Sequence, residues 1–178
     1  MFFKSFNKKV LRITKNGGVG IIPTDTIYGL VGTALNKKTV ERIYKLRHRN
    51  QKKPMIILIG DINDLRIFGI KLKIKAWPPK TSIIFPAPSA KFRYLHRGSR
   101  TLAFRFPRPK KIRDFLNKTG PLVTPSANIE GQPPAKTIKE AQKYFGDKID
   151  FYVDGGRLNK KPSKLIKFNK DRLITIRN

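Results

Sequence analysis

The sequence predicts an α/β fold, a sheet with helices packed on it, and two observations carry this prediction. Short runs of apolar and β-branched residues alternate along the chain with stretches that have helical spacing. No repeat or linker-like segment divides the chain, so residues 1–178 are expected to form a single domain. The last strand candidates follow one another closely, which predicts that part of the sheet is antiparallel and the sheet therefore mixed.

Strands are predicted where an apolar run is short and ends at a proline, a glycine or polar residues. Residues 19–22 form such a run and stop at Pro23. Residues 55–59 are apolar throughout, as expected for a strand that is covered on both faces. The other strand candidates are residues 82–85, 101–106, 122–124, 151–153, 165–168 and 173–176.

Helices are predicted from apolar spacing together with start and stop signals. Asn36 and Asp61 each precede a helical pattern and are expected to cap it. Gly120 and Gly146 each follow one and are expected to end it. Residues 137–140 have the pattern of a capping box. The predicted helices are residues 36–46, 61–68, 112–120 and 137–146.

The composition is strongly basic, and it limits the classes of function. With 40 Lys+Arg against 11 Asp+Glu, the net charge of +29 should attract polyanions such as nucleic acid or nucleotide phosphates. Lysine-rich drift in composition explains the same charge, since the basic residues are scattered. The absence of cysteine excludes disulfides, zinc ribbons and a cysteine nucleophile. No apolar run reaches membrane-spanning length, so a cytoplasmic protein is expected.

Three loops carry more polar chemistry than a simple connection needs. Residues 23–30 follow a buried strand and place two threonines and an aspartate where α/β sheets bind ligands. Residues 47–54 could hold a polyphosphate with arginine forks and a lysine. Residues 120–128 form a proline-stiffened turn that could aim a hydroxyl and an amide at a ligand.

Each loop also has a purely structural interpretation. The first and third could be turns in which the side chains satisfy nearby backbone, and for the first this is the preferred interpretation of the fragment alone. The second could simply place cations at a helix C-terminus. The sequence contains neither of the standard glycine-rich phosphate-binding loops. It also shows no Ser-His-Asp set and no paired carboxylates, so hydrolysis by those routes has little support.

Taken together and in order, these segments resemble the YrdC family of threonylcarbamoyl-AMP synthases. The resemblance runs from about Gly17 to the C-terminus. Its two specific motifs are GGVGIIPTDTIYGL and TPSAN. The matching stretches are residues 17–30, 44–49, 53–55, 77–82, 101–107, 124–128, 131–133, 154–156 and 162–163.

The resemblance implies a twisted, open sheet with a concave, positively charged face. It also implies a nucleotidyltransferase reaction in which L-threonine, bicarbonate and ATP give threonylcarbamoyl-AMP and pyrophosphate. That product would feed the threonylcarbamoyladenosine modification of tRNA, so tRNA and a downstream threonylcarbamoyl transferase complex are expected partners. Mg²⁺ is expected with ATP, and no protein ligands are assigned to it.

The resemblance also implies roles for individual residues. An arginine fork suits the threonine carboxylate, and arginines with a lysine suit the phosphates. The positions implied for L-threonine are Thr26, Arg105, Thr124 and Ser163. Those implied for ATP are Arg49, Lys53, Thr101, Ser126, Pro134 and Arg177. The positions implied for catalysis are Arg47, Arg49, Ser126 and Asn128.

Four positions depart from the family pattern. Arg47 stands where lysine is usual, Leu58 where histidine is frequent, Pro79 where glycine is usual and Glu130 where a small residue is common. Two other functions remain open at this point. One is a non-catalytic protein of the same fold that binds tRNA or double-stranded RNA. The other is a carbamoyl-transfer module that acts on another acceptor.

Overall fold

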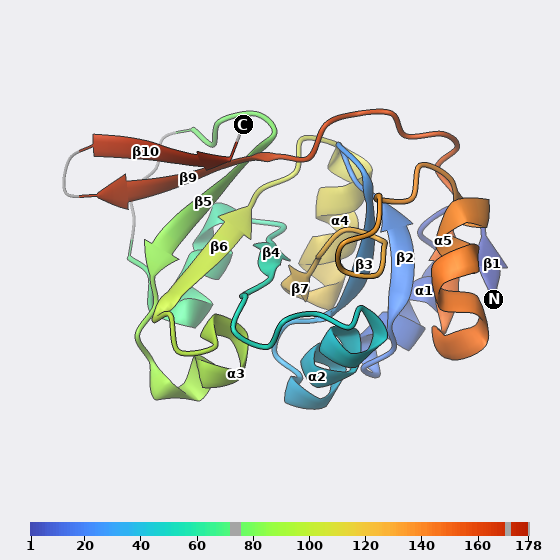
Figure 1. The fold of residues 1–178 in the computed structure, drawn as a ribbon, viewed down its shortest axis with the longest axis horizontal. Helices are drawn as coiled ribbons and strands as arrows, with labels where there is room; N and C mark the ends of the chain where they lie inside the picture. Colours follow the sequence, from blue (N-terminus) through green and yellow to red (C-terminus); the bar gives the residue numbers. More distant parts are fainter. Residues whose placement is uncertain (72–75, 170–171, 178) are drawn as a thin grey trace.

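The computed structural model describes residues 1–71, 76–169 and 172–177, and these residues form one mixed sheet with helices on both faces (Figure 1). The sheet has ten strands in the order β1-β8-β2-β3-β7-β4-β6-β5-β9-β10. The strands are β1 (Phe2–Phe3), β2 (Gly20–Pro23), β3 (Tyr28–Thr33), β4 (Ile56–Leu58), β5 (Thr81–Pro86), β6 (Thr101–Arg105), β7 (Leu122–Val123), β8 (Phe151–Val153), β9 (Lys164–Asn169) and β10 (Arg172–Arg177).

The four predicted helices are observed, although the one over residues 61–68 is a 3-10 helix, and their predicted cap residues and terminal glycines are in place. The Asn36 side chain accepts a hydrogen bond from the Thr39 backbone N–H, and Gly120 and Gly146 follow the last residues of their helices. The α-helices are α1 (Lys8–Lys15), α2 (Lys37–Leu46), α3 (Arg93–His96), α4 (Lys110–Thr119) and α5 (Ile138–Phe145). The 3-10 helices are η1 (Ile62–Phe68), η2 (Ala90–Phe92) and η3 (Gly146–Lys148).

Two apolar cores lie on opposite faces of the sheet. The larger contains buried residues of α2 and α5, and the smaller contains buried residues of α1 and α4. Alternation along a strand divides its side chains between the two faces, so that Ile21 joins the larger core and Ile22 the smaller. None of the helices among the described residues is long and apolar enough to cross a membrane.

The predicted strands all fall on observed strands, and the antiparallel prediction is confirmed for β9 with β10. The sequence interpretation misses β3, because its loop of residues 23–30 includes the start of this strand, which carries Gly29 and Gly32. A Cβ on these glycines would lie 2.5 Å from the Thr124 methyl and 2.4 Å from the Thr39 methyl. The glycines are therefore needed for close packing against the segment after β7 and against α2, and they do not indicate a turn.

Three further differences concern local structure. The elements α1 and β1 were not predicted, although Asn7 accepts two backbone hydrogen bonds as the cap of α1. The strand predicted over residues 55–59 is shorter, Ile56–Leu58. The capping box at residues 137–140 is only half formed. Thr137 caps the Glu140 N–H, but the Glu140 carboxylate accepts from the Lys136 N–H and not from Thr137.

Asp150 connects the start of β2 to α2 and should make stability depend on pH. Its Oδ2 accepts from the Val19 N–H at 2.7 Å and from Arg42 Nη1 at 2.6 Å. Partial burial raises the pKa of this carboxyl, but the hydrogen bonds from Arg42 and Val19 outweigh it, and the pKa lies below its usual value. Because the folded pKa is depressed, this stabilisation is complete above the unfolded-state pKa of about 3.9 and is lost as the pH falls through the folded value.

We therefore expect Asp150→Asn to lower the free energy of unfolding at neutral pH and to flatten its decline in acid. Urea denaturation of the wild type and the variant between about pH 6 and pH 3 measures both effects. Asp114→Asn is the matched control, because Asp114 only pairs with Lys110 on the exposed surface of α4. If the curves of the wild type and Asp150→Asn run parallel into acid, Asp150 is not the linked group.

Candidate functional site

A cavity of about 330 Å³ opens on the face of the sheet formed by β4, β6, β5 and β9. Alternate side chains of these strands line it, while those between them belong to the larger core. Leu58 lines the cavity and is almost completely buried, so an apolar side chain occupies the position where the family often has histidine. The residues of these four strands that line the cavity are Ile56, Leu58, Ile84, Thr101, Ala103, Arg105 and Leu165.

The cavity brings together nine of the twelve residues to which the sequence resemblance gave roles. They come from segments far apart in the sequence, and all of their side chains carry a hydroxyl or a guanidinium. These nine are Thr26, Arg47, Arg49, Thr101, Arg105, Thr124, Ser126, Ser163 and Arg177. The described residues that line the cavity include no carboxylate, so the lining is positively charged.

Three of the twelve residues lie outside the cavity lining. The Lys53 side chain is exposed, and its Nζ lies 3.2 Å from Glu130 Oε1. Asn128 is buried and contacts Arg47, so it lies behind the lining. Pro134 is half-buried in the segment that leads to α5. The structure thus separates these three residues from the groups that face the cavity.

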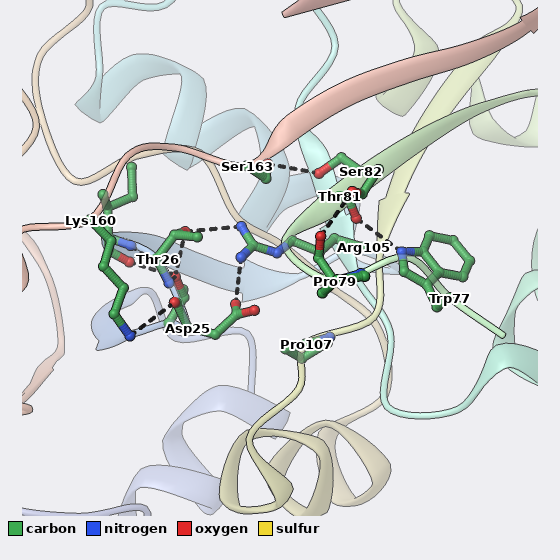
Figure 2. A network of polar contacts seen from close by, with 12 residues as sticks. Asp25, Thr26, Trp77, Pro79, Thr81, Ser82, Arg105, Pro107, Lys160 and Ser163 are labelled. Carbon is green, nitrogen blue, oxygen red and sulfur yellow. Dashed lines mark hydrogen bonds and ion pairs between the residues drawn. The ribbon is translucent and has the colours of Figure 1, made fainter. Parts of the chain in front are cut away.

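At one end of the cavity, Arg105 is held by the loop that precedes β3 (Figure 2). Its Nη2 donates to Asp25 Oδ1 at 2.6 Å and its Nη1 donates to Thr26 Oγ1 at 3.0 Å. The Arg105 and Asp25 side chains are only 6% and 7% exposed. The preferred interpretation of this loop as a local turn is right for Thr24, whose hydroxyl bonds Ile27 and the Thr26 N–H. It is wrong for Asp25 and Thr26, whose side chains accept hydrogen bonds from Arg105 of β6.

A second arginine lies at the same end of the cavity. Arg177 donates from Nε and Nη2 to the Ser163 carbonyl at 3.2 and 2.9 Å. The Ser163 hydroxyl lies 3.0 Å from the Ser82 hydroxyl (Figure 2). The strand register places Arg177 and Arg105 in line across the sheet, with Leu165 and Ser82 between them. Burial, and then the charge of Arg105, lowers the pKa of Arg177. Two such groups beside hydroxyls form a site suited to a carboxylate.

At the other end of the cavity, Arg47 clamps the turn after β7. The side chain lies at the C-terminus of α2, and the residue is only 3% exposed. Its Nε donates to the Asn128 carbonyl at 2.8 Å, and its Nη2 donates to Asn128 Oδ1 at 3.1 Å and to Ser126 Oγ at 3.3 Å. Burial, and then Arg49, lowers the pKa of Arg47 to about 10, so it remains charged at neutral pH.

Glu130 lies between the two cations that were expected to contact phosphate. Its Oε1 is 3.2 Å from Lys53 Nζ and 4.0 Å from Arg49 Nη1, and its Oε2 accepts from the Asn50 N–H at 2.5 Å. The Asn50 hydrogen bond, and then Lys53 and Arg49, keeps the pKa of Glu130 below its usual range. Glu130 is therefore ionised at neutral pH and offsets the positive charge of this part of the site.

We expect Glu130→Gln to tighten ATP binding several-fold, because it removes a negative charge beside Arg49 and Lys53 while keeping an oxygen for Asn50. Titration calorimetry with ATP at low salt measures the change, and higher salt should reduce it. Glu41→Gln is the matched control, since Glu41 pairs with Arg97 at 3.0 Å outside the cavity lining. Unchanged or weaker ATP binding by Glu130→Gln would contradict a phosphate site at this position.

Reasoning from the sequence missed Asp25 and Ser82 as parts of the site. Asp25 lies within the quoted motif, where its residue type suits either a ligand contact or a turn, and the resemblance gave it no role. Ser82 lies opposite Arg105 in the pairing of β5 with β6, a neighbour relation that only the sheet register reveals. Pro79 stands where the family usually has glycine, and its carbonyl accepts a hydrogen bond from the Thr81 hydroxyl at 3.0 Å.

Comparison with known proteins agrees with the fold and the motifs. A model of the Sua5/YciO/YrdC family, described as telomere recombination, matches residues 12–178. A protein of Methanocaldococcus jannaschii is 33% identical over 96% of this chain and 86% of its own length. The threonylcarbamoyl-AMP synthase of Marinobacter nauticus is 31% identical, and the match covers 84% of each chain.

Solved structures show the same fold. Sua5 of P. abyssi, crystallised with L-threonine, has a TM-score of 0.88 at 23% identity, covering 99% of this chain and 57% of that one. YciO of E. coli has a TM-score of 0.82 at 20% identity, covering 99% of this chain and 94% of that one. With a family model that spans most of its length and a relative above 30% identity, this chain belongs to the Sua5/YciO/YrdC family.

Proposed function

We propose that this protein is a transferase that makes threonylcarbamoyl-AMP from L-threonine, bicarbonate and ATP, with release of pyrophosphate. The observation that carries the proposal is the arrangement of the 330 Å³ cavity. It has a two-arginine end beside hydroxyls and, opposite to it, an end with Arg47, Arg49 and Ser126. The name of the Marinobacter nauticus relative and the L-threonine in the P. abyssi structure support the same assignment.

In this proposal the amino-acid substrate occupies the end with Arg105 and Arg177. The guanidiniums hold its carboxylate, and the hydroxyls of Thr26 and Ser163 are available to its polar groups. A site that hydrogen-bonds a substrate hydroxyl rejects an analogue without it, because buried polar groups are then left unpaired. L-Threonine should therefore be used well, L-serine poorly and L-valine hardly at all.

ATP occupies the other end, where the reaction needs charge stabilisation and positioning more than proton transfer. The threonine amine attacks the bicarbonate carbon and water is lost, which gives an N-carboxylate. That carboxylate attacks the α-phosphorus, and pyrophosphate leaves as the new oxygen–phosphorus bond forms. Arg49 and Arg47 stabilise the developing negative charge. The lining residues that the structure describes offer hydroxyls and cations but no carboxylates, so Mg²⁺ bound to ATP would be held by the phosphates and would neutralise part of their charge.

The decisive experiment is to incubate the purified protein with ATP, L-threonine and labelled bicarbonate. Threonine-dependent pyrophosphate release together with a labelled adenylate supports the proposal. Pyrophosphate release at equal rates with L-threonine and L-valine would contradict the assigned pocket. A protein that binds RNA but releases no pyrophosphate would be the non-catalytic alternative. Transfer of a carbamoyl group without dependence on threonine would indicate the alternative with another acceptor.

The product would serve a downstream threonylcarbamoyl transferase that modifies tRNA in the cytoplasm, and the net charge of +29 suits contact with tRNA. If the charge serves this contact, tRNA affinity should fall steeply with salt and show little sequence preference. Filter binding across a salt series measures this dependence. An affinity that does not change with salt would contradict an electrostatic contact, and no binding at low salt would favour compositional drift.

A further inference from the structure

Two buried polar atoms at the threonine end of the cavity have no hydrogen-bond partner within the described parts of the chain. They are Asp25 Oδ2 and Arg105 Nε. The two side chains belong to the same ion pair, yet only Arg105 lines the cavity. Asp25 lies on the side of the Arg105 guanidinium away from Ser163, which lines the cavity (Figure 2). A carboxylate in this position does not touch the substrate, but it can decide where the guanidinium points.

The loop that carries Asp25 forms a rigid bracket for Arg105. Its two consecutive residues Asp25 and Thr26 each accept a hydrogen bond, from Nη2 and Nη1 respectively. The Thr24 side chain holds the bracket in shape through the backbone of Thr26 and Ile27. A guanidinium has five N–H donors in one plane, and two contacts fix that plane. Three N–H groups remain, including Nε–H, and these are available to an anion in the cavity.

Asp25 also offsets a repulsion that would otherwise move Arg105. Arg105 and Arg177 flank the same part of the cavity, and both are positively charged. Without a carboxylate substrate, nothing in the cavity lining balances the two charges, because the described lining residues include no acid. Asp25 supplies the compensating charge from behind, at 2.6 Å. Arg105 can then keep its position before the substrate binds, and the substrate meets a group that is already oriented.

We propose that Asp25 is a positioning residue that fixes Arg105 for the carboxylate of the amino-acid substrate. This inference rests on the proposed function and deepens it, since it names the group that makes the threonine end of the site selective for a carboxylate. It differs from an inhibitory arrangement in which the substrate carboxylate displaces Asp25 from Arg105. In the arrangement proposed here, Asp25 and the substrate contact different N–H groups of Arg105 at the same time.

The test replaces Asp25 by asparagine, which keeps an acceptor oxygen but removes the charge. Binding of L-threonine, measured by calorimetry, should weaken at least tenfold, while binding of ATP should change less than twofold. Asp150→Asn is the matched control, because Asp150 also accepts from an arginine at 2.6 Å but lies away from the cavity. It should lower stability without changing either affinity. Equal threonine binding by Asp25→Asn and the wild type would overturn the inference, as would an equal loss of ATP and threonine binding.

A second measurement uses only the wild type and does not depend on whether the variant folds. In a crystal structure with L-threonine, the Arg105–Asp25 contact should persist while the substrate carboxylate contacts Arg105 from the cavity. A structure in which the carboxylate has displaced Asp25 would overturn the inference and leave the proposed function standing. If the wild type binds no L-threonine at all, the proposed function fails, and this inference fails with it.

Discussion

Replacing Arg105 by alanine is expected to lower the free energy of unfolding by about 3–5 kcal/mol, the cost of leaving a buried charge without its partner. The partner is Asp25, whose side chain is 7% exposed and whose Oδ1 accepts from Arg105 at 2.6 Å. In the double variant Arg105→Ala/Asp25→Asn, part of this loss should return, because the uncompensated carboxylate is gone. Use of L-threonine should be strongly reduced in both variants, since both lack Arg105 and keep only Arg177 for its carboxylate.

Arg177→Ala is the matched control for this experiment. Arg177 lines the same end of the cavity, but among the described residues it donates to Ser163 and forms no ion pair with a carboxylate. Its removal strands no buried charge, so we expect a stability loss of about 1 kcal/mol or less together with weaker ligand binding. Urea denaturation of the four proteins measures these differences. Equal losses in Arg105→Ala and Arg177→Ala would mean that the ion pair with Asp25 is not the cause.

The variant Arg105→Lys tests whether the site needs only the positive charge of residue 105 or also the planar hydrogen-bonding geometry of arginine. Arg105→Lys keeps the positive charge beside Asp25, so it should cost less stability than alanine. Lysine cannot contact Asp25, Thr26 and a substrate carboxylate in one plane, so threonine use should still fall strongly. Pyrophosphate release at a series of L-threonine concentrations measures this loss.

Most of the fold could be predicted because its elements follow local rules. Strands such as β4 are short apolar runs, and helices such as α2 carry a capping asparagine and helical spacing. The element β3 could not be found this way. Its glycines are required because Thr124 and Thr39 pack closely against them, and Thr124 lies far from them in the sequence. The helix α1 has a cap signal at Asn7, but it is short, and its β-branched residues Val10, Ile13 and Thr14 lower its helix propensity.

The site could be predicted only where a motif marks it. The hydroxyls and arginines that line the cavity lie in the quoted motifs, and the fold brings nine of them together. The layer behind them could not be predicted. Asp25 is typical of a turn by residue type, and only the position of β6 makes it a partner of Arg105. Glu130 was recognised only as a departure from the pattern, and its contact with Lys53 depends on how two loops meet.

Arg47 carries the second large expected effect. Arg47→Ala should reduce adenylate formation at least a hundredfold and lower the free energy of unfolding by about 2–3 kcal/mol, the cost of leaving buried acceptors unpaired. Arg47 donates hydrogen bonds to the Asn128 carbonyl, to Asn128 Oδ1 and to Ser126 Oγ, and the substitution removes all three. Because Asn128 lies behind the lining, its contribution to the site passes through this clamp. Urea denaturation and pyrophosphate release measure the two effects.

Arg47→Lys distinguishes a clamp from a simple charge. Lysine is common at this position in the family pattern, and it keeps the charge near the phosphates. One ammonium cannot replace the planar contacts of Nε and Nη2 with three acceptors, so we expect activity between that of the wild type and that of alanine. Arg42→Ala is the control, since it breaks the ion pair with Asp150 away from the cavity and should leave the kinetic constants unchanged. If Arg47→Lys is more active than the wild type, the charge of Arg47 matters to the reaction and its clamp on Asn128 does not.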